Sequence, residues 1–428
     1  MSLNDRKEGQ MLALEVIAVL AAVPTLLGGS LASASPPSAH TALTASPPAS
    51  DDMVTEAAGL PGSFPVVFDN ATKGAWSDKQ IYITIIGQAS PGQWSYLRPD
   101  GSAVHINHLD ATAPGHLTKH GVDYPDMSFT LAQRSTVEVP PDFQGGRIYV
   151  SLGSPLYIAV TANNGGWAGP DPVNPSDPNA DVYYDWYEFT YDYGSIPFGG
   201  NTTEVDMFGL PLAARLQQAS SGYDKTLGIT LSRSKVYADY RASVGAAFLP
   251  LAGMYRILSP GTSLSFAPGG PEAGYLRGRI SAAWSYYTNH RFELNQDGVR
   301  FAGQVQGGQL HFTENGQGPY VLSEPTTTDV VQCSGALASV GMSTPELQLG
   351  ADFCAAFNRG VALHTSEWST ASDYYPGGAE NDYAKFFHTV AIDGLAYGFP
   401  YDDVNGQSSV AILSNARPPT SLRLEIGW

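Results

Sequence analysis

The chain has 428 residues, enough for two or three domains, and 43% of them are hydrophobic, which suffices for a large core. Only 14% of the residues are charged, and the formal net charge is −18. Nucleic acids and anionic lipids are polyanions, so this charge argues against both as partners. A neutral polysaccharide meets no such repulsion, and an acidic surface also favours solubility.

The first 34 residues have the pattern of an export signal. Arg6 and Lys7 precede an apolar run at residues 11–27, and residues 32–34 read Ala-Ser-Ala, which fits a signal cleavage site. The run is interrupted and short for a membrane span, which disfavours the alternative of an uncleaved anchor. We therefore expect residues 1–34 to be a cleaved signal peptide, and the protein to be secreted and free of the membrane afterwards.

The next segment, residues 35–61, is rich in Pro, Ser, Ala and Thr, and we expect it to be a disordered linker. From residue 62 to about residue 210, short runs of β-branched and aromatic residues alternate with turn signals. Many short strands are typical of a β-sandwich or a barrel. The predicted strands include residues 64–68, 80–86, 147–152 and 156–161.

Beyond residue 210 the pattern becomes mixed. Residues 210–218 predict the start of a helix, with a proline tolerated in its first turn. Residues 347–358 and 381–392 also have helical spacing. Strand-like pieces occur at residues 310–312 and 410–413, so the middle of the chain is predicted to be mixed α/β.

The chain contains two cysteines, Cys333 and Cys354. In an exported protein they most simply form one disulfide, and two buried free thiols are the alternative. His105 and His108 have no evident third ligand for zinc. The loop at residues 171–181 is rich in oxygen donors but lacks the Gly and terminal Glu of an EF-hand. We expect no metal site and no cofactor, and a polar loop at this place.

Two acidic residues lie in segments that resemble neighbouring strands. In an extended strand at residues 183–191, Glu188 shares a face with Tyr184 and Trp186, while the intervening residues point to the other face. A Gly/Pro-containing loop follows and can turn the chain back into a second segment that carries Asp206. Glu188 and Asp206 could then stand across a groove from each other.

Such a pair can hydrolyse a glycosidic bond. One carboxyl group protonates the leaving oxygen, and the other activates water or attacks the sugar carbon. Aromatic neighbours such as Trp186 could raise the pKa of Glu188 by desolvation, which suits the acid, whereas Asp206 as base should be the wetter residue. The alternative is a pair of solvated or hydrogen-bonded acids at strand ends.

The amino-acid sequences of these segments resemble those of a known family. Residues 187–191 (YEFTY) and 205–212 (VDMFGLPL) resemble glycoside hydrolase family 64, the secreted β-1,3-glucanases, and more distantly the thaumatin-like proteins. Residues 354–359 (CAAFNR) and 397–404 (YGFPYDDV) are also similar to segments of these proteins. The resemblance covers roughly residues 62–428.

The resemblance implies a mainly β fold with an α+β part. A thaumatin-like β-barrel or sandwich would begin with residues 62–210, a mixed α/β domain would be inserted at residues 211–385, and residues 386–428 would return to the β domain. A wide groove would lie between the two domains.

The resemblance also implies roles for individual residues. Glu188 would be the general acid and Asp206 the general base of an inverting hydrolysis. Phe198 is the nearest counterpart of an aromatic residue that often lines a subsite in the family, and Trp186 would lie along the same cleft as Glu188. The residues expected at sugar subsites are Trp186, Thr190, Asp192, Phe198 and Thr203.

We therefore expect a secreted, monomeric endo-1,3-β-glucanase that releases laminari-oligosaccharides from β-1,3-glucans such as laminarin or curdlan. A non-catalytic thaumatin-like β-glucan-binding or defence protein is the alternative, and a hydrolase of another glycan, such as β-1,6-glucan, is a third possibility. Asn201 begins a glycosylation sequon, but a glycan there would crowd the site, so we expect this residue to be unmodified.

Overall fold

The structure, a computed structural model, describes residues 54–55 and 59–428. The signal peptide predicted for residues 1–34 and most of the linker predicted for residues 35–61 lie outside the described residues. Within that linker, Val54–Thr55 forms a short strand, β1, that pairs with a strand at Ala103–His105. None of the helices in the described part of the chain is long and apolar enough to cross a membrane.

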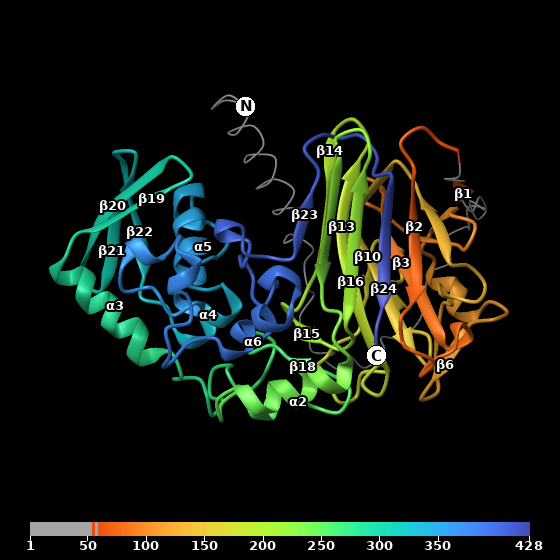
Figure 1. The fold of residues 1–428 in the computed structure, drawn as a ribbon, viewed down its shortest axis with the longest axis horizontal. Helices are drawn as coiled ribbons and strands as arrows, with labels where there is room; N and C mark the ends of the chain where they lie inside the picture. The colour runs from red at the N-terminus through yellow and green to blue at the C-terminus, as the bar shows by residue number, and fades with distance from the viewer. Residues whose placement is uncertain (1–53, 56–58) are drawn as a thin grey trace, which may run out of the picture.

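Two sheets pack face to face and form a β-sandwich (Figure 1). The nine-stranded sheet runs β1-β5-β4-β3-β10-β13-β14-β23, with β8 paired to β3. Its other strands are β3 (Ile81–Ser90), β4 (Gln93–Leu97), β5 (Ala103–His105), β8 (Phe129–Thr130), β10 (Asp142–Leu152), β13 (Tyr183–Asp192), β14 (Ile196–Thr202) and β23 (Val410–Ile412).

The second sheet has five strands in the order β17-β16-β24-β2-β9. The strand β24 near the C-terminus is inserted between β16 and β2, and it runs parallel to β2. The end of the chain therefore completes a sheet that the beginning of the fold starts. These strands are β2 (Phe64–Asn70), β9 (Thr136–Val139), β16 (Leu212–Gln218), β17 (Tyr223–Gly228) and β24 (Ser421–Ile426).

Aromatic side chains fill the space between the two sheets. Phe64 of β2 packs edge-on against Phe198 of β14, with ring centroids 5.4 Å apart, and Phe198 stacks on Phe189 of β13 at 5.7 Å. These rings are fully buried, together with Val, Ile and Leu from both sheets. Burial of this apolar surface is the main source of stability for the sandwich.

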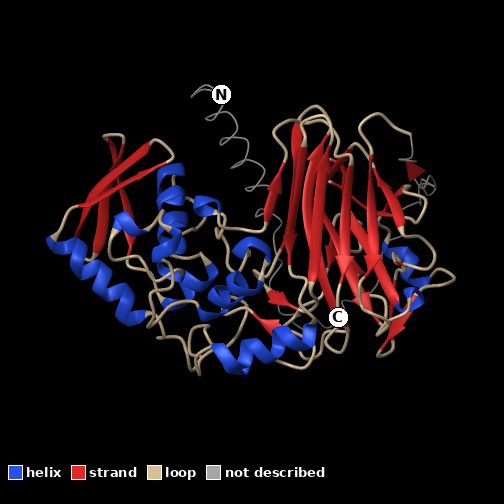
Figure 2. Ribbon diagram, viewed as in Figure 1, coloured by secondary structure: helices blue, strands red, loops and turns tan. Residues whose placement is uncertain are grey.

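The region between β17 and β23 contains the longest helices and its own hydrophobic core (Figure 2). A four-stranded antiparallel meander forms one end of it, and helices cover the rest. The meander strands are β19 (Phe292–Gln296), β20 (Val299–Gln306), β21 (Gln309–Glu314) and β22 (Gln317–Ser323), and the helices are α2 (Arg233–Ser243), α3 (Arg277–Asn289), α4 (Thr327–Gln332), α5 (Thr344–Asn358) and α6 (Asp382–Val390).

Shorter elements connect these parts. The two-stranded pairs are β6 (Leu117–Lys119) with β7 (Val122–Tyr124), β11 (Ala159–Val160) with β12 (Trp167–Ala168), and β15 (Met207–Phe208) with β18 (Ile257–Leu258). The 3-10 turns are η1 (Asp78–Gln80), η2 (His108–Thr112), η3 (Leu249–Leu251), η4 (Thr365–Glu367), η5 (Ala371–Asp373), η6 (Ile392–Gly394) and η7 (Val404–Gly406).

The predicted fold class is confirmed: the protein is mainly β with an α+β part, and the β part is an open sandwich, not a closed barrel. The helices predicted at residues 347–358 and 381–392 are present as α5 and α6. Figure 1 places the helical region beside the strands β14 and β23. The wide groove between the two parts stays a prediction.

The helix predicted at residues 210–218 is wrong, because this segment is the strand β16. Its residues have good helix propensity, but Leu212, Ala214 and Leu216 alternate with other residues and lie in the sandwich core. The strand pairs with β17 on one side and β24 on the other, and this tertiary pairing outweighs local propensity. The helical region therefore begins after β17, later than the predicted boundary at residue 211.

The strand predicted at residues 156–161 is also mostly wrong, since only Ala159–Val160 pairs as β11. The amide side chain of Asn179 explains the difference. Its oxygen accepts the backbone N–H of Tyr157 at 2.8 Å, and its nitrogen donates to the carbonyl of Tyr157 at 3.0 Å. A side chain thus takes the place of a partner strand.

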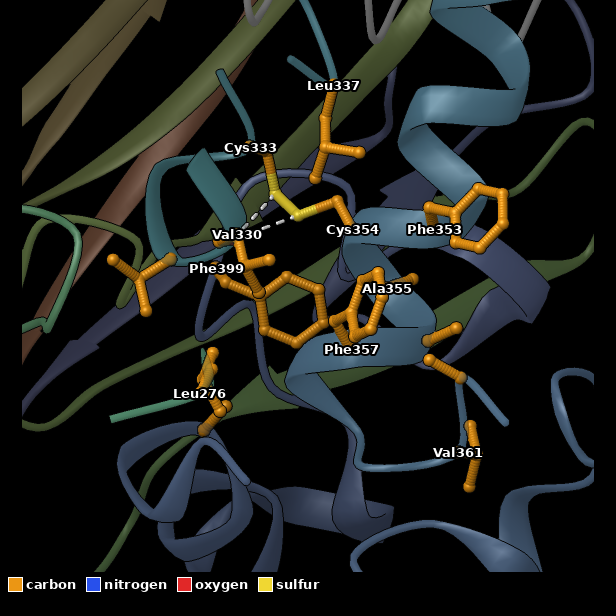
Figure 3. Packing of buried hydrophobic residues seen from close by; sticks show 14 of the residues in the cluster. Leu276, Val330, Cys333, Leu337, Phe353, Cys354, Ala355, Phe357, Val361 and Phe399 are labelled. Carbon is orange, nitrogen blue, oxygen red and sulfur yellow. Dashed lines mark hydrogen bonds between the residues drawn. A yellow bond between two sulfur atoms is a disulfide. The ribbon is translucent and has the colours of Figure 1, made fainter. Parts of the chain in front are cut away.

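The predicted disulfide between Cys333 and Cys354 is confirmed (Figure 3). It joins the residue that ends α4 to the middle of α5, and both cysteines lie in the core of the helical region. Figure 3 shows Leu337, Phe353 and Phe357 packed around it.

We predict that replacing both cysteines, Cys333→Ala with Cys354→Ala, lowers the free energy of unfolding by about 3 kcal/mol, because the bond restricts a loop of this length in the unfolded chain. Urea unfolding followed by tryptophan fluorescence measures this. The wild-type protein should lose the same stability in reductant, and the double variant should not respond to it. A wild-type protein that is equally stable with and without reductant would contradict the prediction.

Candidate active site

The strand β13 presents two different faces, as the sequence predicts. Tyr187, Phe189 and Tyr191 point into the sandwich core. Tyr184 and Trp186 belong to a separate cluster on the outer face of the same sheet, together with Tyr149 of β10. Because side chains alternate along a strand, Glu188 lies on this outer face with Trp186.

Glu188 is held by two donors from neighbouring positions. Arg147 of β10 is its direct partner in the strand register, and the guanidinium Nη2 lies 3.0 Å from Oε1 of Glu188. The indole nitrogen of Trp186 donates to the same oxygen at 3.0 Å. The Glu188 side chain keeps 15% of its surface exposed, so it is fixed in direction but still reaches solvent.

Arg147 is fixed in turn by the aromatic cluster. Its Nη1 donates to the hydroxyl of Tyr149 at 3.2 Å, and the guanidinium lies 5.6 Å from the centre of the Trp186 ring. Burial opposes the charge of Arg147, but Tyr149, Glu188 and Asp206 together hold the pKa of the guanidinium above its ordinary value. Arg147 therefore carries a permanent positive charge beside both acids.

Asp206 lies in the connection that leaves β14 and enters β15. Its carbonyl accepts the backbone N–H of Ser259 at 3.0 Å, and the hydroxyl of Thr262 approaches its Oδ1 at 3.5 Å. One residue further, β15 pairs with β18. The backbone of Asp206 is thus anchored to the region inserted after β17.

The electrostatics link the two acids. Burial raises the pKa of Asp206, Arg147 acts against this, and the negative charge of Glu188 raises it further. The raised pKa differs from the sequence-based expectation of a readily ionised base, whereas both acids are partly exposed, so the expectation that Asp206 is the wetter of the two stays a prediction. The two carboxyl groups therefore influence each other's charge, and each is held by a different part of the fold.

The other residues predicted at sugar subsites differ in their burial and in their hydrogen bonds. Trp186 is buried, and its indole N–H donates the hydrogen bond that orients Glu188. Thr190 and Thr203 are buried, and their hydroxyls accept backbone N–H groups of Gly145 and Val205. Asp192 is partly exposed at the end of β13, and burial and the neighbouring Asp142 raise its pKa.

The prediction for Phe198 is corrected by its position. This side chain is 0% exposed and lies in the sandwich core between Phe64 and Phe189. It points to the face of the sheet opposite Glu188, where no sugar can reach it. Asn201 is also fully buried, as the partner of Glu188 across the strand pair, so its sequon offers no accessible acceptor in the folded protein.

Aromatic residues continue across the outer face of the sheet. Trp94 of β4 and Trp167 of β12 are partly exposed, with ring centroids 5.7 Å apart, and Trp167 also meets Tyr149 at 6.1 Å. Tyr96 packs against the same cluster. We call Trp94, Tyr96 and Trp167 the aromatic surface. Partly exposed rings of this kind present apolar faces beside the carboxyl groups.

In the oxygen-rich loop at residues 171–181, two acids bond within the loop, and the third, Asp181, pairs with Lys119 at 2.8 Å. Asp171 accepts the N–H of Val173, and Asp177 accepts the N–H groups of Asp171 and Asn179. Part of this loop and residues 250–258 line a hollow of about 440 Å³ next to β18. Within residues 54–55 and 59–428, no group of three or more His, Cys, Asp or Glu side chains is arranged to hold a metal ion.

Sequence reasoning did not single out Arg147 or Tyr397, and it named Asp403 only within the family-like segment at residues 397–404. Arg147 begins a run that was identified as a strand, but only the register shows that it lies opposite Glu188. Tyr397 and Asp403 come from the C-terminal part, where the Tyr397 hydroxyl donates to Oδ1 of Asp403 at 3.4 Å. Burial raises the pKa of Tyr397, and so do the charges of Asp403 and Glu188.

Comparison with known proteins adds a family match. The family model for glycoside hydrolase family 64, described as Beta-1,3-glucanase, matches residues 62–426. Two curated relatives, both named glucan endo-1,3-beta-glucosidase, are 26% identical over 295 residues (Cellulosimicrobium cellulans) and 296 residues (Arthrobacter sp., strain YCWD3). Each match covers 65% of this chain and 51% of the relative, so the chain spans about half the length of these proteins.

Solved structures agree with this match. A β-1,3-glucanase domain of the same family from Clostridium beijerinckii superposes with a TM-score of 0.80 at 32% identity, covering 86% of this chain and 98% of that one. A laminaripentaose-producing β-1,3-glucanase from Paenibacillus barengoltzii, solved with laminarihexaose, has a TM-score of 0.69 at 33% identity, covering 86% of this chain and 75% of that one. The likeness to thaumatin-like proteins stays a prediction.

We predict that Arg147→Met raises the pKa of Asp206 further, because a nearby positive charge that favours the carboxylate is removed. A ¹³C NMR titration of the aspartate carboxyl groups measures this shift. Arg215→Met is the matched control, since Arg215 pairs with the exposed Asp224 on β17. An unchanged or lowered pKa of Asp206 in the Arg147 variant would show that the two groups do not interact.

Proposed function

The chain belongs to glycoside hydrolase family 64, and we propose that it hydrolyses β-1,3-glucan with Glu188 as general acid and Asp206 as general base. The observation that carries the proposal is the single electrostatic site that Glu188, Arg147 and Asp206 form within the matched residues. The endo-acting relatives support internal cleavage, with laminari-oligosaccharides as products.

The surroundings of the pair suit a neutral sugar polymer. The aromatic surface and Trp186 lie on the same side of the sheet as Glu188, and aromatic faces pack well against the C–H faces of glucose rings. The net charge of −18 does not repel an uncharged chain. A negatively charged glycan would meet Glu188, Asp192 and Asp206 at the site and is disfavoured.

The chemistry proceeds in one step. Glu188 gives its proton to the glycosidic oxygen as the bond from this oxygen to C1 breaks. Asp206 takes a proton from a water molecule whose oxygen attacks C1 from the opposite side, so the configuration at C1 is inverted. Glu188 then regains a proton from solvent and Asp206 releases one, which restores the starting state.

Arg147 helps this cycle without touching the sugar. In the free enzyme it and Trp186 hold Glu188 in one orientation, and its charge partly offsets the effect of burial on Asp206. A base that loses its proton more easily can work at a lower pH.

Glu188→Gln and Asp206→Asn should each lower kcat on laminarin by about 10²- to 10⁴-fold without unfolding the protein, because general acid and base catalysis contribute factors of this size. Reducing-sugar release and circular dichroism measure activity and fold. Glu293→Gln, an exposed acid paired with Arg300 on the meander, is the control and should keep full activity.

The two variants should also differ from each other. Glu188→Gln should retain much of its activity on an aryl laminaribioside with a good leaving group, since that group departs without a proton. Asp206→Ala should instead be rescued by azide, which replaces the activated water. Wild-type rates in either single variant on laminarin would refute the assignment, and wild-type protein that binds insoluble glucan but releases no sugar would indicate a binding protein.

The pH profile of kcat/KM should report the raised pKa of Asp206. The base works only when deprotonated, so kcat/KM should fall as the pH drops through this pKa, which lies above the ordinary value of 3.8. Thr262→Val removes a hydrogen bond that lowers the pKa and should move the acid limb to higher pH. Thr226→Val, an exposed change on β17, should leave it in place. An acid limb at or below the ordinary aspartate value would contradict this reading.

Secretion and a monomeric state belong to the same proposal. A secreted enzyme meets polysaccharide outside the cell, which is consistent with the export signal predicted at residues 1–34. Mass spectrometry of protein from the culture medium would reveal the mature N-terminus, and a mature chain that still contains residues 1–34 would refute signal cleavage.

A further inference from the structure

Glu204 is a buried acid two residues before Asp206, in the connection between β14 and β15. Only 5% of its surface is exposed. Burying a carboxyl group costs free energy of folding unless its hydrogen bonds are satisfied, so the contacts of Glu204 indicate its role. None of the mechanism described above uses this side chain.

The contacts of Glu204 join three separate parts of the chain. Its backbone N–H donates to the carbonyl of Tyr397 at 3.0 Å, and the N–H of Tyr397 donates back to the Glu204 carboxyl Oε2 at 3.1 Å. The hydroxyl of Tyr383, in α6, donates to the carbonyl of Glu204 at 2.6 Å. The residue therefore ties the Asp206 connection to α6 and to the segment that follows it.

Tyr397 carries this link to the other acid. Its hydroxyl donates to Asp403, and the negative charge of Glu188 is among the influences that raise its pKa, after burial and Asp403. The backbone of Tyr397 thus bonds to the Asp206 connection, and its hydroxyl bonds to Asp403. Glu204 and Tyr397 therefore hold together the Asp206 connection and the segment that carries Tyr397 and Asp403.

We propose that Glu204 is a positioning residue: its side chain fixes Tyr397 against the connection that carries Asp206, and so sets the base relative to Glu188. This inference rests on the proposed function of the pair. The connection has a further tie, since the carbonyl of Asp206 accepts the N–H of Ser259, and just after β15 the N–H groups of Gly209 and Leu210 donate to Asp185. Glu204 is the tie to α6 and to the segment of Tyr397.

To hold Tyr397, the side chain of Glu204 needs a hydrogen-bond acceptor and not a negative charge. Burial raises the pKa of Glu204 well above its ordinary value, and the nearby charges of Asp185 and Asp402 raise it further. A neutral carboxyl group still accepts the Tyr397 N–H through one oxygen. Glutamine has the same shape and keeps that oxygen, whereas alanine removes it and leaves the N–H of Tyr397 without its acceptor.

Glu204→Ala and Glu204→Gln test the proposal as a matched pair on laminarin. Glu204→Ala should lower kcat per folded molecule by about 10- to 100-fold with KM within about threefold of wild type, since a displacement near 1 Å has such effects. It should also shift the acid limb of the pH profile, because Asp206 changes its surroundings. Glu204→Gln should stay within about threefold of wild type in every parameter.

Two results would overturn the proposal. One is a Glu204→Ala variant whose kcat per folded molecule equals that of wild type, which would mean that the residue only supports folding. The other is a Glu204→Gln variant that loses as much activity as Glu204→Ala, which would mean that the charge or the proton of Glu204 takes part directly.

Hydrogen exchange separates this inference from the proposed function. In Glu204→Ala, amide exchange should increase at residues 203–207 and 395–399 and stay unchanged in the meander, while Glu204→Gln should match wild type throughout. If wild-type protein hydrolyses no glucan, the proposed function fails. Amide hydrogen exchange then tests by itself whether Glu204 holds Tyr397 in place. Unchanged exchange at both segments in Glu204→Ala would refute it.

Discussion

The register of β10 against β13 is the constraint on which the site depends. It places Arg147 opposite Glu188 on the outer face of the sheet. A bulge between Phe143 and Gly146 sets this register, and Gly145 adopts a φ of 56° there, which favours glycine. A side chain on Gly146 would approach the Phe189 ring to 2.7 Å. A slip by one residue would turn Glu188 into the core, where its charge could not be satisfied.

The base depends on a different part of the molecule from the acid. Glu188 lies within a central strand of a nine-stranded sheet, whereas Asp206 lies in a connection whose backbone is held by Ser259, and the chain just beyond β15 is held by Asp185. Asp185 comes from the same strand as Glu188 and points the other way, and burial raises its pKa to about 7 against the N–H groups that bond to it. The strand thus orients one acid directly and anchors the other through the backbone.

The sequence predicts the faces of a strand and the positions of helices correctly where the local pattern and the tertiary structure agree. The alternation around Glu188 gave the correct faces of β13, and the helical spacing gave α5 and α6. The segment at Leu212–Gln218 failed because its helix-forming residues pair on both sides as a strand.

The site itself was predicted only in part, because its contacts come from residues far apart in the chain. Phe198 follows a glycine- and proline-containing turn, and only the observed pairing with β13 shows that it faces the core. Arg147 and Tyr397 carry no local signal, since what matters is which acid each of them meets. The roles of Glu188 and Asp206 came from the family resemblance, whose match over residues 62–426 is now established.

The central claim is that Glu188 and Asp206 act from opposite sides of the sugar, with a water molecule between Asp206 and C1. The anomeric form of the first product measures this most directly, because it records the side from which the new bond formed. Proton NMR of laminarin during the first minutes of hydrolysis should show the α-anomer before mutarotation. Initial formation of the β-anomer would contradict the account, since it would mean that a carboxylate, not water, attacks C1 first.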